Sequence, residues 1–140
     1  LVFMHSLEIV HRDIKPHNIL FQSATGSEEP TGLLLADFGL ASRVEDINCE
    51  VVCGTPGFIA PEVLHRRRYG ARADIFSVGA TLFYTMVRKR PFRGSDVKTT
   101  LKLNASAQLT FPEDADPQEE EYIRWLCSKS PVDRPDADAA

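Results

Sequence analysis

The side chains that could do chemistry are concentrated in one short polar segment, residues 11–18, between two apolar stretches. In chain order they are His11, Arg12, Asp13, Lys15, His17 and Asn18. A second acidic residue, Asp37, follows the next apolar stretch. Asp13, Asn18 and Asp37 supply oxygen ligands of the kind that hard cations prefer, and Lys15 adds a positive charge beside them. Carboxylate, amide and ammonium groups gathered in this way suit a metal-bound phosphate.

Two brief strands must hold this polar segment in place, and they are predicted over residues 19–21 and 33–35. Residues 22–31 between them are rich in Ser, Thr, Gly, Glu and Pro, which indicates a surface turn. Two short strands around a turn predict a β-hairpin. Residues 1–6 are typical of the end of a helix. Residues 38–60 have no clean hydrophobic period, so we expect a long ordered loop there.

Four helices are predicted after this loop, over residues 61–66, 72–87, 95–104 and 118–128. The second is apolar around nearly its whole circumference, which is typical of a helix buried on all sides. It should form the core axis, and Pro91 prevents it from continuing. The expected fold class is mainly α with a small β-hairpin. The length of 140 residues fits one domain.

The composition excludes several classes of protein. The 16 basic and 20 acidic residues give a formal net charge of −4, whereas nucleic-acid binders usually have a basic excess. We therefore expect no nucleic-acid partner. No apolar run approaches the roughly 20 residues of a membrane helix, and the start shows no signal-peptide pattern. The basic runs 65–68 and 88–93 are interpreted as solvated faces, with docking sites as the alternative.

The chain has three cysteines, Cys49, Cys53 and Cys127. An odd number without paired short spacings indicates neither a disulfide framework nor a zinc site. We interpret them as reduced intracellular thiols and expect a cytoplasmic location. The alternative for Cys53, which lies near the proposed chemistry, is a redox-sensitive thiol.

Three motifs resemble the signatures of eukaryotic Ser/Thr protein kinases, and the resemblance covers essentially the whole chain. The motifs are His11-Arg12-Asp13-Ile14-Lys15-Pro16-His17-Asn18, Asp37-Phe38-Gly39 and Ala60-Pro61-Glu62. They resemble the catalytic loop, the metal-binding triplet and the end of the activation segment. Residues 53–62 look most like calcium/calmodulin-dependent-type kinases. Residues 74–77 and His17 are also similar to a stress-sensing kinase with a ribonuclease tail.

The resemblance implies a role for each residue of the polar set. Asp13 would accept the proton of the substrate hydroxyl, and Lys15 would bind the phosphoryl group and neutralise its charge. Asn18 and Asp37 would hold Mg²⁺ against the phosphates of ATP. Thr55 would connect the catalytic loop to the bound substrate. The expected cofactors are ATP and Mg²⁺, and the expected partners are proteins with Ser or Thr acceptors.

Other motif residues are implied to be structural. His11 is interpreted as a packed scaffold residue, not as a general base. Glu62 is expected to form a buried ion pair with Arg134, and Asp74 is expected to anchor the backbone of the catalytic loop. These roles all follow from the resemblance.

The activation segment departs from the family pattern, because residues 43–54 contain no Ser, Thr or Tyr. In many kinases a phosphate in this segment pairs with the arginine that corresponds to Arg12. Our hypothesis is that Glu45, Asp46 or Glu50 pairs with Arg12 instead. The alternative is that Arg12 pairs with nothing and the loop is mobile.

The chain also lacks the glycine-rich loop, strand lysine and helix glutamate that complete a kinase. We therefore expect residues 1–140 to be the large, carboxy-terminal lobe only, cut from a longer protein and inactive alone. The alternative function is a pseudokinase or scaffold that binds partners without catalysis. The retention of Asp13, Lys15, Asn18 and Asp37 argues against it.

Overall fold

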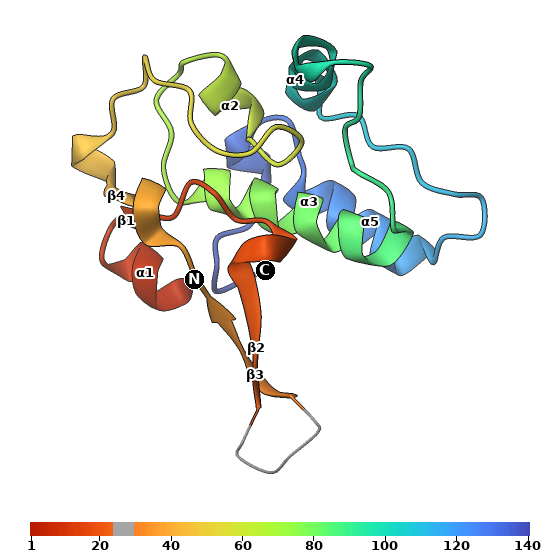
Figure 1. Ribbon diagram of the computed structural model, residues 1–140, viewed down its shortest axis with the longest axis horizontal. Coiled ribbons are helices and arrows are strands. Elements are labelled where there is room, and N and C mark those ends of the chain that lie inside the picture. The colour runs from red at the N-terminus through yellow and green to blue at the C-terminus, as the bar shows by residue number, and fades with distance from the viewer. Residues whose placement is uncertain (24–29) are drawn as a thin grey trace.

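The computed structural model describes residues 1–23 and 30–140, and it consists of a helical body from which a β-hairpin projects (Figure 1). Two antiparallel strand pairs precede the main helices. The strands are β1 (Ile9–Val10), β2 (Ile19–Ser23), β3 (Pro30–Leu35) and β4 (Ser42–Arg43). The helices are α1 (Val2–Ser6), α2 (Pro61–Leu64), α3 (Arg72–Val87), α4 (Val97–Ser106) and α5 (Pro117–Leu126). This architecture agrees with the predicted mainly α class with a small hairpin.

The hairpin pairs β2 with β3, from Ile19 opposite Leu35 to Ser23 opposite Pro30. Both strands are longer than predicted, and the rest of the expected turn, residues 24–29, lies outside the described residues. The predicted loop 38–60 is mostly irregular, but it was wrong to expect no strand in it. Its residues Ser42 and Arg43 form β4, which pairs with β1. A two-residue strand has no periodicity that a sequence pattern could reveal.

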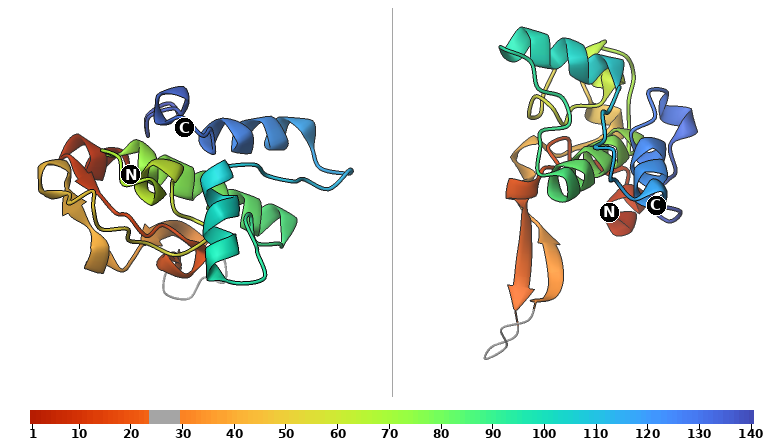
Figure 2. Two further views of the ribbon diagram at one scale, coloured as in Figure 1. Left: turned by 90° about the horizontal axis from the view of Figure 1, so that it is seen from above. Right: turned by 90° about the vertical axis from the view of Figure 1, so that its right-hand side faces the viewer.

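Helix α3 is the core axis, with the bounds that its apolar circumference predicted. Figures 1 and 2 show it in the middle of the body, with α5 running beside it. The two helices approach closely at Gly79. A Cβ atom there would lie 2.7 Å from both the Sγ of Cys127 and the Cβ of Leu126, so only glycine allows this distance. Phe76, on the same helix, stacks on Phe92 with ring centroids 6.0 Å apart.

Capping residues set the ends of the shorter helices. The carboxylate of Asp96 accepts the Thr99 N–H at 2.7 Å, and Asp116 accepts the N–H of Gln118 at 2.8 Å. These caps start α4 two residues later and α5 one residue earlier than predicted, because an N-cap supplies the first orphan N–H groups with acceptors. Helix α2 is shorter than predicted because Arg66 adopts a left-handed conformation (φ 54°).

All three cysteines are free thiols. Cys127 is buried between α3 and α5, and burial raises the pKa of its thiol to about 12. Cys53 is half-buried, with its Sγ 3.8 Å from the hydroxyl of Tyr69. None of the helices in the described part of the chain is long and apolar enough to cross a membrane.

Candidate active site

The polar segment 11–18 connects β1 to β2, and Asp74 in the first turn of α3 holds it in place. The fully buried carboxylate of Asp74 accepts the backbone N–H groups of His11 at 2.8 Å and Arg12 at 2.9 Å. This confirms the predicted anchor. The Nε2 atom of His5 lies 3.0 Å from the same carboxylate. The sequence reasoning missed His5, because nothing in a five-residue helix marks a side chain that acts 69 positions away.

His11 is a buried scaffold residue, as predicted. Its Nδ1 accepts the backbone N–H of Asp13 at 3.3 Å, so its Nε2 carries the proton and donates to the carbonyl of Ala36 at 3.1 Å. The ring also packs edge-on against Phe38, with centroids 5.1 Å apart. His11 therefore connects the polar segment to the residues that follow β3.

Asp13, Lys15 and Thr55 form a closed triangle of hydrogen bonds. Lys15 Nζ lies 2.6 Å from Oδ2 of Asp13, and the Thr55 hydroxyl donates to Oδ1 of Asp13 at 2.6 Å. Lys15 also donates to Thr55 Oγ1 at 3.0 Å. The side chain of Asp13 is 9% exposed and that of Lys15 is 21% exposed, so the attraction between the carboxylate and the ammonium is screened less than at the surface. The structure thus brings together three of the predicted site residues from segments 40 positions apart.

Backbone features hold Thr55 against the triangle. Gly54 has φ 103°, and a Cβ there would lie 2.7 Å from the carbonyl oxygen of Arg12, so the segment needs glycine at this crossing. Buried Asn104 on α4 accepts the N–H of Gly57 at 2.9 Å and donates to the carbonyl of Ile59 at 2.7 Å. Sequence reasoning missed Asn104, although an amide among apolar positions of an amphipathic helix is a usable signal.

Asn18 and Asp37 lie at the same end of the hairpin, because the Ala36 N–H donates to the Asn18 carbonyl at 2.8 Å. Asn18 Nδ2 donates to the Asp13 carbonyl at 2.9 Å, which leaves the side-chain oxygen for a ligand. Asp37 is exposed in a left-handed conformation (φ 62°), and its Oδ1 accepts the Gly39 N–H at 3.3 Å. One amide and one carboxylate fit Mg²⁺, which usually keeps waters and takes its other ligands from phosphates.

Within the described ranges, no group of three or more His, Cys, Asp or Glu side chains forms a protein-only metal cage. Two oxygen donors at a strand end are too few for a structural metal held by protein ligands alone. They suit an ion that takes its other ligands from phosphates. The chemistry of this donor set therefore fits the Mg²⁺ that the resemblance implies.

The predicted acidic partner of Arg12 is wrong. The Arg12 Nε donates to the carbonyl of Leu40 at 2.5 Å, and its Nη1 lies 3.5 Å from the hydroxyl of Tyr69. Glu50 instead lies 3.9 Å from Arg66 in an exposed pair. Two neutral acceptors contact the guanidinium here, and the acidic side chains of the segment stay in solvent, where their charge is hydrated. Burial raises the pKa of the Tyr69 phenol, so Tyr69 stays neutral beside Arg12.

The predicted ion pair of Glu62 and Arg134 is present and buried, with two hydrogen bonds of 2.7 and 2.8 Å. It joins the start of α2 to the segment after α5. Because Pro61 and Glu62 end the segment that contains Thr55, this pair fixes the end of that segment.

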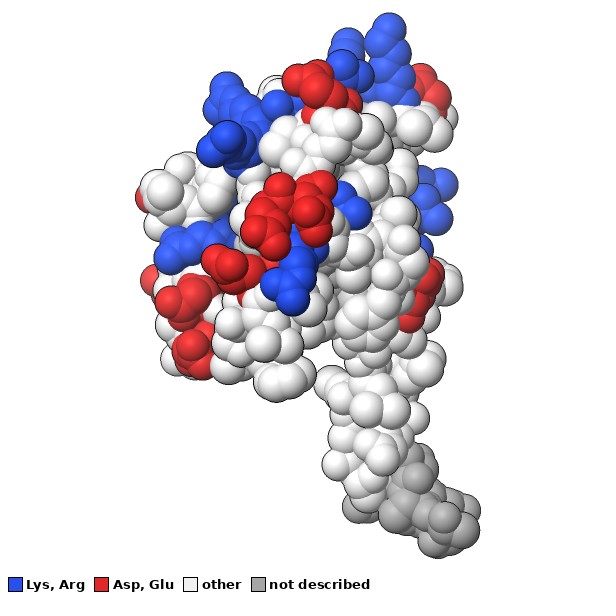
Figure 3. All heavy atoms as spheres, turned by 90° about the vertical axis from the view of Figure 1, so that its left-hand side faces the viewer, with Lys and Arg blue, Asp and Glu red and all other residues white. Residues whose placement is uncertain are grey.

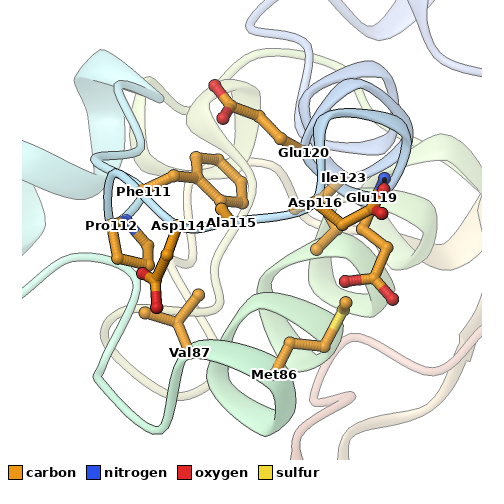
Figure 4. A pocket seen from close by; sticks show the side chains of 10 residues that line it. All are labelled: Met86, Val87, Phe111, Pro112, Asp114, Ala115, Asp116, Glu119, Glu120 and Ile123. Atoms are coloured by element: carbon orange, nitrogen blue, oxygen red, sulfur yellow. Dashed lines mark hydrogen bonds between the residues drawn. The ribbon is translucent and has the colours of Figure 1, made fainter.

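A hollow of about 220 Å³ lies apart from these residues, between the end of α3 and the start of α5 (Figure 4). Its floor is apolar, with the ring of Phe111 pointing into it, and carboxylates surround it. Two of the carboxylates have structural roles, because Asp116 caps α5 and Glu120 pairs with Arg124 at 2.7 Å. The hollow is not part of the candidate active site.

The comparisons with known proteins agree with this geometry. The family model described as "Protein kinase domain" matches residues 1–140. The chain is 37% identical over 135 residues to "Probable serine/threonine-protein kinase 2" of Plasmodium falciparum, covering 94% of this chain and 26% of that protein. It is 32% identical over 140 residues to "Serine/threonine-protein kinase PLK2" of Mus musculus, covering 99% of this chain and 20% of that protein.

A third relative is "Serine/threonine-protein kinase atg1" of Schizosaccharomyces pombe, 36% identical over 155 aligned positions, which covers 99% of this chain and 19% of that protein. The chain thus spans about a fifth to a quarter of the length of these relatives. Since the family model covers every residue and the relatives are serine/threonine kinases, the chain belongs to the protein kinase domain family.

Proposed function

We propose that the protein carrying this chain transfers the γ-phosphoryl group of ATP to Ser and Thr hydroxyls of other proteins. The observation that carries the proposal is the triangle of Asp13, Lys15 and Thr55, in which every side chain contacts the other two. A carboxylate, a cation and a hydroxyl meet in this triangle. Such a set supports the proposal, because transfer of a phosphoryl group needs charge stabilisation and positioning more than covalent chemistry.

Each member of the triangle has its own role in the proposal. Asp13 accepts the proton of the acceptor hydroxyl and orients its oxygen. Lys15, already 2.6 Å from Asp13, offsets the negative charge that develops on the transferring group. Thr55 holds the activation segment against both and so couples substrate binding to the catalytic loop. Lysine at this position supports Ser/Thr rather than Tyr as the acceptor.

Asn18 and Asp37 are the proposed ligands of Mg²⁺. When bound, the ion would shield the phosphate oxygens and so lower the repulsion that an incoming hydroxyl meets. The hydrogen bond from Asn18 to the Asp13 carbonyl supports this role, because it fixes the Asn18 amide at the mouth of the catalytic loop.

We also propose that this chain is the large lobe of a two-lobed kinase, of the calcium/calmodulin-dependent type. The resemblance of residues 53–62 supports the type, and the hairpin supports the assignment to the large lobe. Leu20, Phe21, Leu33 and Leu34 are all exposed, and the described part of the hairpin carries no charged side chain (Figure 3). Neighbouring residues of a strand point to opposite faces, so the pair Leu20–Leu34 lies on one face of the hairpin and the pair Phe21–Leu33 on the other. Exposed apolar surface of this kind is suited to a covering partner, which a small lobe would supply. The free thiols support a cytoplasmic location.

The test is a phosphotransfer assay with the full protein, ATP labelled at the γ position, and matched peptides that carry Ser, Tyr or Ala as the acceptor. We expect label on the Ser peptide only, and we expect D37N to raise the Mg²⁺ concentration needed for half-maximal rate. Absence of transfer to any peptide, with ATP binding intact, would favour the pseudokinase or scaffold alternative.

A further inference from the structure

A groove of about 760 Å³ lies between the end of α2 and the segment that follows α5, on side chains that the proposed phosphoryl transfer does not use. Basic residues line both of its walls. Arg67 and Arg68 come from the segment after α2, and Lys129 comes from the segment after α5. The sequence alone favoured a solvated face over a docking site for the run 65–68. Only the fold shows that Lys129, about 60 positions later, lines the same groove.

The positive charge of the groove is not neutralised by its own acidic residues. Glu62 lines the groove but is buried, and both of its oxygens already bind Arg134. Among the described residues, the salt bridges involve neither Arg67 nor Lys129. Arg67, Arg68 and Lys129 therefore face one exposed carboxylate, that of Asp133, which leaves an excess of positive charge.

The walls of the groove offer donors and few acceptors. The carbonyls of Ser128 and Lys129 already accept hydrogen bonds from Arg134, at 2.7 and 3.2 Å. The carbonyl of Pro131 accepts one from Arg72 at 3.2 Å. With these acceptors occupied, the side chains that remain for a ligand are the three cations, His65 and Ser130, with Asp133 as the one exposed carboxylate. A ligand of negative charge is the one that complements them.

The backbone that carries the arginines is fixed. The Arg67 N–H donates to the Glu62 carbonyl at 2.9 Å, and the Arg66 N–H donates to the Val63 carbonyl at 3.1 Å, with Arg66 in the left-handed conformation. These two bonds form a Schellman motif, which ends α2 and sets the direction of the chain. The Arg67 side chain therefore projects from a fixed backbone position, so no backbone freedom is lost there when a ligand binds.

We propose that this groove binds a phosphorylated Ser or Thr segment of a partner protein. A phosphate carries about −1.5 to −2 charges and three acceptor oxygens, and guanidinium groups bind it through two parallel hydrogen bonds. Two arginines on one wall and a lysine on the other match three oxygens. A single carboxylate, with one charge and two oxygens, would leave part of this set unpaired. The proposal does not rest on phosphoryl transfer by the site at Asp13.

The test is fluorescence anisotropy of a labelled peptide with two phosphoserines among Gly and Ala residues, titrated with the full protein. The groove variant R67Q/K129Q removes two positive charges, and the control variant R90Q/R93Q removes two from exposed residues elsewhere. We expect the groove variant to weaken binding about tenfold or more and the control to change it less than about twofold. A second variant, R68Q, should weaken binding severalfold, and circular dichroism verifies the fold of each.

Four results would overturn the proposal. The first is equal weakening by the groove and control variants, which would mean unspecific attraction to net charge. The second is equal affinity for a peptide with Glu in place of phosphoserine, which would identify an acidic-segment site. The third is groove-dependent binding of a single-stranded oligonucleotide as tight as that of the peptide. The fourth is no saturable peptide binding up to about 1 mM.

Discussion

Replacing Arg134 with alanine should strongly destabilise the protein, because it breaks the buried pair with Glu62. The guanidinium makes two hydrogen bonds to Glu62, at 2.7 and 2.8 Å. It also donates to the carbonyls of Ser128, Arg72 and Lys129, and its Cζ lies 5.0 Å from the ring centroid of Phe76. One side chain thus joins α2, α3 and the segment after α5.

The magnitude follows from the burial of the pair. At a charge separation of about 4 Å and an effective dielectric constant of about 20, the attraction is about 4 kcal/mol. R134A removes it and leaves the Glu62 carboxylate, only 5% exposed, without its partner. Removal of one member of a buried pair typically costs about 3–5 kcal/mol. Since whole domains are stable by about 5–15 kcal/mol, the loss is a large share of the total.

The assay is urea unfolding followed by far-ultraviolet circular dichroism. The matched control is E120Q, which breaks the exposed pair of Glu120 and Arg124 and should cost less than about 1 kcal/mol. R134K, which keeps the charge but loses the planar fork, should fall between R134A and the wild type. A loss below about 1 kcal/mol for R134A, or one no larger than that of E120Q, would refute the reasoning.

Three further predictions concern the catalytic loop, the core and the activation segment. D74N should speed amide hydrogen exchange in the pair His11 and Arg12, because an NH₂ group replaces one of the two oxygens that accept these N–H groups. Unchanged exchange at both would contradict the anchor. Burial raises the pKa of the Cys127 thiol from 9.0 to about 12, so the neutral thiol contributes stability that is fully present below pH 9 and is lost as the pH rises toward 12. Thermal melting measures this dependence, and C127S should flatten it. Phosphatase treatment of the full protein should change its phosphotransfer rate less than about twofold, because residues 43–54 contain no Ser, Thr or Tyr and Arg12 already has neutral acceptors. A large loss of rate traced to dephosphorylation of the activation segment would contradict this prediction.

The sequence was most informative where a local pattern determines the structure. The bounds of α3 were predicted because its apolar circumference leaves burial as the only stable arrangement. The roles of Asp74 and of the Glu62–Arg134 pair were predicted from motif resemblance, and the structure confirms both contacts. The catalytic, cofactor and metal roles of the polar set stay predictions.

The rest depends on contacts between distant segments. Asn104, which clamps the segment after Thr55 through two hydrogen bonds, lies 45 positions from its acceptor Ile59. The partner of Arg12 was predicted wrongly because an acidic side chain was expected to replace the phosphate that pairs with this arginine in the family. The fold instead supplies a carbonyl at Leu40 and a phenol at Tyr69. No local periodicity encodes such pairings.

The most direct test of the account is the single-turnover rate of phosphoryl transfer by the full protein with the substitution D13N. Asparagine keeps the size of the side chain and an acceptor for the Thr55 hydroxyl, but it cannot accept the substrate proton. We predict a fall in rate of about 10²–10⁴-fold with ATP affinity changed little. A variant that keeps a tenth or more of the wild-type rate would contradict the assignment of Asp13 and the phosphoryl-transfer site built on it.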